Sequence, residues 1–179
     1  MEALFSFLAT FWQALLPLFI VQEYEGAVHL RLGRFYRTVE PGIYWKIPFG
    51  LDLIHRTNVK PGPATMRAQS LVTADGVDVV IQARIIWSVS DVRTFLIEIE
   101  GEDAILSDAV YGVITEQVAA ANWDDIRTEA FRHACHKAAR ARARKLGASV
   151  DNLYFSDVAR MQSFRLITGW TPQHDPEAA

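Results

Sequence analysis

Two histidines and a cysteine, His133, Cys135 and His136, are the side chains with the clearest potential for metal chemistry. Imidazole and thiolate groups are common zinc ligands, and a zinc site needs at least three protein ligands. His133 and His136 share one face of a predicted helix, whereas Cys135 points to another face. Cationic side chains crowd the same stretch and oppose a metal ion. We therefore interpret it as a solvated basic face with a core cysteine, and expect no metal and no cofactor.

The rest of the sequence lacks the short motifs that carry catalysis. It contains no Gly-x-Ser-x-Gly, no phosphate loop and no dinucleotide fingerprint. Its 179 residues, half of them hydrophobic and 22% charged, suit one globular domain with an appendage. A net charge of -3 is not typical of a nucleic-acid-binding protein. We expect a protein that is not an enzyme.

Charge is distributed unevenly along the chain. Residues 91–125 carry a net charge of -8, and residues 126–146 carry +6. The basic block could bind nucleic acid, but an acidic block of similar size favours pairing with acidic protein surface, so we expect no nucleic acid partner. The two blocks either neutralise each other within one chain or meet on neighbouring copies, and an alanine-rich helix face favours neighbours. The residues predicted at this oligomer interface are Arg132, Lys137, Arg140, Arg144, Glu98, Glu100, Glu102 and Asp103.

Residues 3–21 form an uncharged apolar run at the N-terminus. As a helix it would span roughly 28 Å, close to the ~30 Å hydrocarbon core of a bilayer. A buried core helix is the alternative, although core helices rarely carry so long a charge-free run. Pro17 lies near the end of this run and Trp12 lies in its middle. The segment could therefore anchor the protein in either of two ways, as a helix that spans the bilayer or as a shallow re-entrant helix. The predicted anchor residues are Phe5, Leu8, Phe11, Trp12, Leu15, Leu16, Pro17, Phe19 and Ile20.

The orientation of this anchor follows from the basic residues beside it. Arg31, Arg34 and Arg37 follow the apolar run closely, and no Lys or Arg precedes it. The positive-inside rule therefore predicts a membrane-associated protein with its globular domain on the cytoplasmic side.

The order of the predicted elements indicates an α+β fold. Apolar residues at alternate positions predict strands, most clearly from Val77 to Val89, and Asp75-Gly76 before it predicts a hairpin with a type I′ turn. The predicted elements are strands at 28–32, 51–57 and 77–89, helices at 91–98 and 102–121, a helix from Asn122 or Asp124 to Gly147, and a strand at 150–157. We divide the chain into an anchor (1–22), a globular domain (23–160) and a short C-terminal segment with a loose tail (161–179).

Four motifs in order resemble the stomatin–prohibitin–flotillin family, also called band 7 or SPFH. They are GAVHLRLGR at 26–34, PGI at 41–43 followed by IPF at 47–49, TADGVDV at 73–79, and Gly147 with Val150, Asp157 and Val158. Ile47, Pro48 and Phe49 place apolar groups on a loop that either touches the membrane beside the anchor or folds back on the core.

The resemblance implies an SPFH domain in a non-enzymatic membrane scaffold. Such a protein would contact membrane lipid, assemble into a homo-oligomeric ring or cage, and confine partners such as a membrane AAA+ protease or other membrane proteins. Family members usually continue into a long coiled coil, so we expect any tall helical wall to come from a partner chain. The alternative is a structural ring component of a larger particle, with the apolar N-terminus packed against protein.

Overall fold

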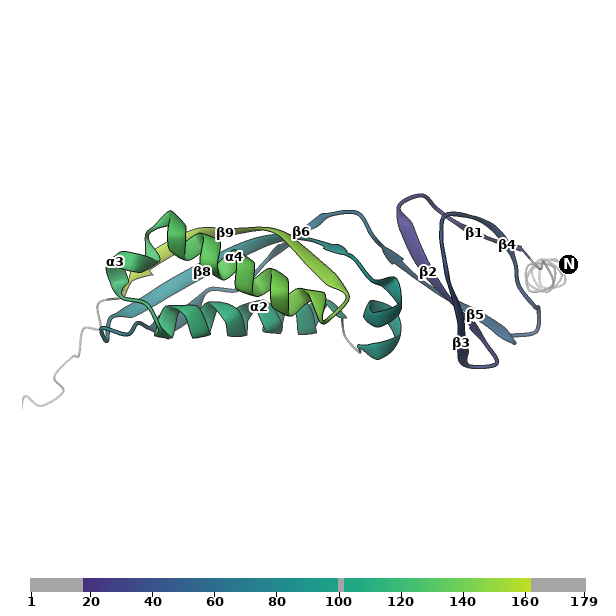
Figure 1. Cartoon of the computed structure of the whole chain (residues 1–179), viewed down its shortest axis with the longest axis horizontal. Helices are drawn as coiled ribbons and strands as arrows, with labels where there is room; N and C mark the ends of the chain where they lie inside the picture. The colour runs from purple at the N-terminus through teal and green to yellow at the C-terminus, as the bar shows by residue number, and fades with distance from the viewer. Residues whose placement is uncertain (1–17, 100–101, 162–179) are drawn as a thin grey trace, which may run out of the picture.

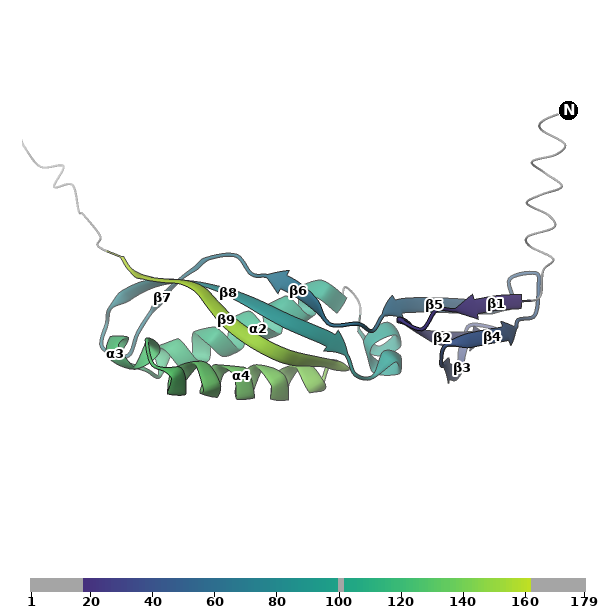
Figure 2. The same ribbon diagram turned by 90° about the horizontal axis from the view of Figure 1, so that it is seen from above.

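The computed structural model describes residues 18–99 and 102–161, and the side chains of 18–99 and 104–161. Two modules follow each other along its long axis (Figure 1). A small β module contains β1 to β5, and a larger module contains β6 to β9 with the helices. The sheet of the larger module has α2 and α4 on one face (Figure 2). These layers agree with the α+β class predicted from the sequence, and the predicted anchor helix lies outside the described residues except at its end.

The small module consists of two sheets packed together. Strands β1 (Leu18–Val21) and β4 (Gly42–Trp45) pair antiparallel, and β2 (Glu25–Arg31) lies between β3 (Arg34–Val39) and β5 (Asp52–Asn58). Its core is small and is formed by the buried residues Phe19, Val21, Ala27 and Val39.

The expected anchor boundary at residue 22 is wrong, because β1 begins at Leu18. Phe19 and Ile20, predicted on a helix, lie on this strand, where Phe19 is buried and stacks on Tyr44 with ring centroids 5.5 Å apart. An uncharged run fits a strand that is buried on one face as well as it fits a helix. The other anchor residues, Phe5 to Pro17, lie outside the described residues.

The alternation expected along 28–32 holds only in part. Val28 is buried as predicted, but His29 is also fully buried, and Leu32 is exposed in the turn before β3. His29 is covered by the ring of Phe19, whose centroid lies 5.8 Å from the imidazole centroid. Strand β2 is therefore covered on both faces at this point, and only the tertiary structure determines that.

The larger module is built on β8 (Asp78–Val89), and its predicted apolar face is confirmed. Val79, Ile81, Ala83, Ile85 and Val89 are buried in the main core. One side of β8 pairs with β6 (Gly62–Thr65) and β7 (Gln69–Val72), and the other pairs with β9 (Ala148–Arg160). Strand β9 is longer than the predicted 150–157, since its pairing with β8 continues to Arg160.

The β7–β8 hairpin is present, but its turn is not type I′. Gly76 has a φ of +76°, whereas Asp75 is not among the residues with positive φ. The Thr73 N–H donates to Val77 O at 3.0 Å, and the Gly76 N–H donates to Thr73 O at 3.0 Å. This is a three-residue loop that ends in a left-handed glycine.

We expect Gly76→Val to lower the free energy of unfolding by about 1–3 kcal/mol, because valine is strained at positive φ. A Cβ atom at this position would meet no atom within 4 Å beyond the two adjacent residues, so the cost comes from the backbone alone. Gly76→Asn is the control and should cost less, since asparagine tolerates this conformation. Chemical denaturation of both variants measures the difference. A Gly76→Val protein as stable as the parent would contradict the assignment.

Helices cover the sheet after β8. A π-helix, η1 (Thr94–Glu98), follows Asp91, whose carboxylate accepts from the Arg93 and Thr94 N–H groups. Helix α2 (Glu102–Ala119) then packs beside α4 (Glu129–Arg144). No helix in the described part of the chain is both long enough and apolar enough to cross a bilayer.

The single helix predicted from Asn122 or Asp124 to Gly147 is divided in two. A short helix α3 (Trp123–Ile126) precedes α4, and the Thr128 hydroxyl caps α4 by accepting from the Phe131 N–H at 3.3 Å. Gly147 ends this segment with a φ of +68°, as predicted. A side chain there would lie 2.6 Å from the Asp91 carbonyl oxygen. Glycine thus allows η1 to pack against the end of α4.

Candidate membrane and assembly surfaces

The side chains considered as metal ligands do not converge. Cys135 is fully buried in the core, His133 is exposed, and the His136 Nε2 atom lies 3.1 Å from the Val150 carbonyl oxygen. Burial raises the pKa of the Cys135 thiol to about 12, so it is protonated at neutral pH. Within residues 18–99 and 102–161, no three ligand-type side chains are placed to hold a metal ion.

The outward face of the β1–β4 pair is apolar. Leu18 is opposite Trp45 and Ile20 is opposite Ile43 in the register, and all four are exposed. Trp45 is 71% exposed and Ile43 is 69% exposed, whereas Phe19 and Val21 on the other face are buried. Large apolar groups gathered on one exposed face are typical of an interaction site.

The loop of residues 46–51 joins β4 to β5 at the same end of the molecule (Figure 2). Phe49 is 79% exposed, and Ile47 is also exposed, while Pro48 is half-buried. Phe49 and Gly50 both have positive φ, at 68° and 76°. Phe49 therefore does not fold back on the core, although contact of this loop with a membrane remains a prediction. We call Leu18, Ile20, Ile43, Trp45, Ile47 and Phe49 together the apolar end.

A buried carboxylate holds the start of this loop. Asp52 accepts from the Arg31 guanidinium at 3.0 and 3.2 Å and from the Ile47 N–H at 2.8 Å. The His29 Nε2 atom lies 2.9 Å from Asp52 Oδ2, and the Asp52 side chain has no solvent exposure. The Arg31 hydrogen bonds hold the pKa of Asp52 well below its usual range, and the Ile47 N–H and His29 add to this against the opposing effect of burial. Asp52 thus fixes where the loop leaves the module.

Sequence reasoning did not identify Asp52, because its partners are remote in the sequence. Arg31 and Asp52 are cross-strand partners at the end of the β2–β5 ladder. Arg31 also lies over the Tyr36 ring at 4.3 Å from the centroid. Arg31 is therefore bound within the module, and Arg34 and Arg37 are the exposed cations of the three used to predict orientation.

The outward face of α4 is basic and lined with small side chains. Phe131, Cys135, Ala139 and Ala143 face the core. Opposite them, the exposed residues are Ala130, Ala134, Ala141, Lys137, Arg140 and Arg144. None of the three cations forms an ion pair with a residue in the described part of the chain. They are available to an acidic surface.

Some charges of the acidic and basic blocks are instead paired within the chain. Arg142 of α4 binds Glu116 of α2 at 3.1 and 3.2 Å, and Arg132 binds Glu129 on its own helix. Part of the basic block is therefore neutralised internally, one of the two alternatives considered above. Of the acidic partners, Glu98 is exposed at the end of η1. Glu100 lies outside the described residues, as do the side chains of Glu102 and Asp103.

Several curated proteins are similar to this chain over part of its length. An uncharacterized protein of Methanocaldococcus jannaschii is 26% identical over 107 residues, which cover 60% of this chain and 53% of that protein. Protein HflC of Vibrio parahaemolyticus is 25% identical over 103 residues, covering 54% of this chain and 31% of HflC. A protein named modulator of FtsH protease HflC, from Escherichia coli K12, is 26% identical over 95 residues, covering 49% and 28%. The matched regions thus span about half the length of the first relative and less than a third of the other two.

A family model covers most of the chain. The model described as SPFH domain / Band 7 family matches residues 19–164, which begin inside β1 and include all the later elements of both modules. The strands and helices described above lie in the order that the sequence motifs indicated. The chain therefore belongs to the SPFH domain / Band 7 family.

Proposed function

We propose that this protein is a non-enzymatic, membrane-associated scaffold that assembles side by side on a bilayer and organises partner membrane proteins. The observation that carries the proposal is the apolar end, which begins at Leu18, the first described residue after the predicted anchor residues 5–17. Its large exposed side chains would enter the membrane interface while the helical module extends away from it. Tryptophan and phenylalanine favour this environment.

Simple energetics support contact through the apolar end. Fully burying one large apolar side chain contributes about 1.5–3 kcal/mol. Trp45 and Phe49 alone would supply several kcal/mol of attachment in addition to any anchor. Arg34 and Arg37, both exposed on β3, add attraction to anionic headgroups of about 1 kcal/mol each near the surface. This distribution of charge supports the cytoplasmic leaflet as the site of attachment.

The proposed assembly is a homo-oligomer formed through the basic outward face of α4. Lys137, Arg140 and Arg144 would meet acidic side chains of a neighbouring copy, with Glu98 as one contributor. The name of the Escherichia coli relative supports a membrane AAA+ protease of the FtsH kind as a partner. The scaffold would regulate or confine such a partner without chemistry of its own.

Vesicle flotation of three forms of the protein tests membrane attachment. The full chain should float with phosphatidylcholine–phosphatidylglycerol vesicles after a high-salt wash. Deleting residues 1–17, which leaves the buried Phe19 and Val21 in place, should weaken flotation without unfolding the domain. Adding Trp45→Glu and Phe49→Glu to this deletion should lower vesicle partitioning further, on the order of a hundredfold.

The matched control is Val72→Glu with Ile105→Glu in the same deletion, because Val72 and Ile105 are exposed apolar residues of the larger module. It should float like the deletion alone. A full chain that stays with a large particle and never floats would overturn the membrane proposal and support the ring-component alternative. If the deletion and its double glutamate variant float equally, the apolar end does not contribute to membrane attachment.

A further inference from the structure

Strand β9 is an open edge in the described part of the chain. It pairs with β8 from Ala148 to Arg160, and no described strand lies on its other side. A free edge presents unpaired backbone groups that can pair with another strand. Bulges place the extra residues Asp151 and Ser156 in β9 and bracket a regular stretch from Asn152 to Phe155. This stretch is where a further strand could pair.

The direction of the backbone groups in this stretch follows from the sheet register. The Met66 N–H donates to Ala83 O at 2.9 Å, so the backbone groups of Ala83 face away from β9. Phe155 is opposite Ala83, and this is therefore a non-hydrogen-bonded pair. By alternation, Leu153 opposite Ile85 has the same orientation. The N–H and C=O groups of Leu153 and Phe155 thus point to the open edge.

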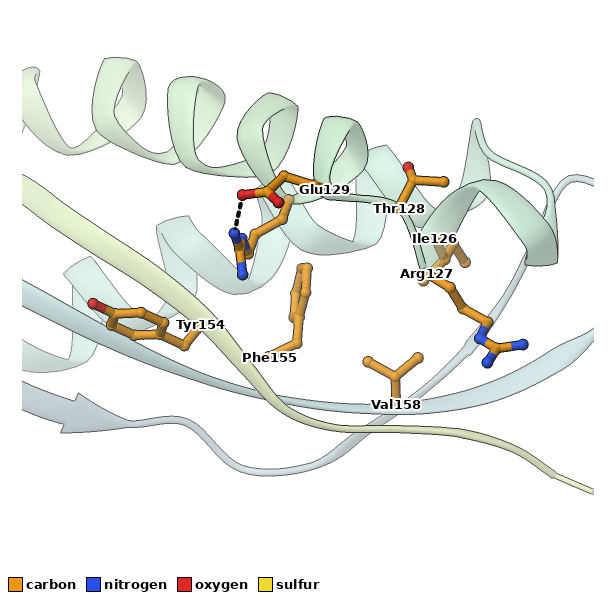
Figure 3. A pocket seen from close by; sticks show the side chains of 8 residues that line it. Ile126, Arg127, Thr128, Glu129, Tyr154, Phe155 and Val158 are labelled. Atoms are coloured by element: carbon orange, nitrogen blue, oxygen red, sulfur yellow. Dashed lines mark hydrogen bonds and ion pairs between the residues drawn. The ribbon is translucent and has the colours of Figure 1, made fainter.

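A cleft runs between this edge and the beginning of α4. It has a volume of about 530 Å³, and Figure 3 shows Tyr154, Phe155 and Val158 on one side facing Thr128 and Glu129 on the other. A narrower continuation of about 140 Å³ extends along Asn152 and Leu153 toward His136. The contact of His136 with the Val150 carbonyl oxygen closes the edge there. The cleft therefore admits a short extended segment.

The charge of the cleft selects the chemistry of that segment. Arg127 and Arg132 line it, and Glu129 is its one acidic lining residue. Glu129 is already bound by Arg132. Arg127 lies 5.9 Å from the Trp123 ring centroid and has no carboxylate partner among the described residues. Carboxylates entering the cleft would meet Arg127, and they could also meet Arg132 through the N–H donors that Glu129 does not use.

We propose that the β9–α4 cleft binds an extended acidic segment of a partner polypeptide. The segment adds as a short strand at Leu153 and Phe155 and places its carboxylates beside Arg127 and Arg132. Main-chain hydrogen bonds supply affinity in this mode of recognition, and side-chain contacts supply specificity. The site is separate from the apolar end and from the outward face of α4.

Binding of a defined peptide to the purified full chain in detergent tests this site. The probe is acetyl-SEVEVES-amide, and acetyl-SQVQVQS-amide is its neutral counterpart. We expect the acidic peptide to bind at least about tenfold more tightly. It should slow hydrogen exchange of the Leu153 and Phe155 amides. Two further versions of the acidic peptide are N-methylated, one at its valines and the other at its glutamates. At least one of them should lose binding, because methylation removes the N–H groups on the edge of the peptide that pairs with β9.

Two pairs of variants complete the test. The double variant Arg127→Gln with Arg132→Gln should bind the acidic peptide about tenfold more weakly than the parent protein does. Arg67→Gln with Arg84→Gln removes the same charge from exposed positions of the same module outside the cleft and should leave binding unchanged. Absence of binding would overturn the proposal. So would binding without amide protection, or binding of both N-methylated versions as tight as that of the parent peptide, since each would leave charge attraction without strand addition.

Discussion

Replacing Asp52 by asparagine should lower the free energy of unfolding of the small module by about 3 kcal/mol. The change leaves the buried His29 and the Arg31 guanidinium without their carboxylate. Removing one partner of a buried pair costs more than the pair contributes, because a desolvated charge is left uncompensated. We place the cost at the low end of the known range, since Arg31 is about one-third exposed. Thermal and chemical denaturation of the variant give the measurement.

Asp157→Asn is the matched control for this change. Asp157 is exposed on β9, so its loss of charge should change stability by no more than about 0.5 kcal/mol. The Asp52 variant should also increase hydrogen exchange in residues 46–51, because the Ile47 N–H loses a charged acceptor. An Asp52→Asn protein as stable as the control would show that the cluster does not hold the loop.

The effect should depend on pH in a defined direction. The pKa of Asp52 is lowered in the folded protein, whereas an aspartate in the unfolded chain titrates at about pH 4. The stabilisation is thus fully present above about pH 4 and is lost as the pH falls toward the folded pKa. The stability difference between parent and Asp52→Asn should therefore be largest at neutral pH and narrow in acid.

Reversing three charges on the outward face of α4 should dissociate the proposed oligomer and leave the fold intact. The variant is Lys137→Glu, Arg140→Glu and Arg144→Glu. Arg132 belongs to the predicted interface but is bound to Glu129, so it is left unchanged. Each exposed pair contributes only about 0–1 kcal/mol, so single reversals should do little and three together should act. Higher ionic strength should weaken the parent assembly in the same direction.

Light scattering in detergent at two salt concentrations measures the mass of each form. The control reverses Arg67, Arg84 and Arg160, which are exposed cations of the same module, and changes the net charge equally. It should keep the mass of the parent. If the parent and the α4 variant have the same particle mass at both salt concentrations, assembly does not depend on charge complementarity. Association through the N-terminal segment would then be favoured.

The family and the central strand could be predicted because their signals are local. The motifs at 26–34 and 73–79 are contiguous, and the period of two along β8 is repeated often enough to fix its buried face. The comparisons confirm the family that these motifs indicated. Glycine at 147 was likewise identifiable, because a helix end needs a residue that tolerates positive φ.

The missed features depend on contacts between distant residues. His29 is a polar residue at an alternate position, and its burial is explained by the rings of Phe19 from β1 and Tyr36 from β3. Asp52 acquires its role from Arg31, its partner across the ladder. The division between α3 and α4 was missed because Thr128 is an equally good cap four residues beyond Asp124.

The position of residue 49 relative to a bilayer tests the central claim most directly. Cys135 is fully buried, so a cysteine at Phe49 or Val72 can be labelled selectively with an environment-sensitive fluorophore. With phosphatidylcholine–phosphatidylglycerol vesicles, the label at residue 49 should shift to the blue and become protected from aqueous quenchers. The label at residue 72, on the larger module, should do neither. No shift at residue 49, or an equal shift at both positions, would contradict a scaffold attached to the membrane through its apolar end.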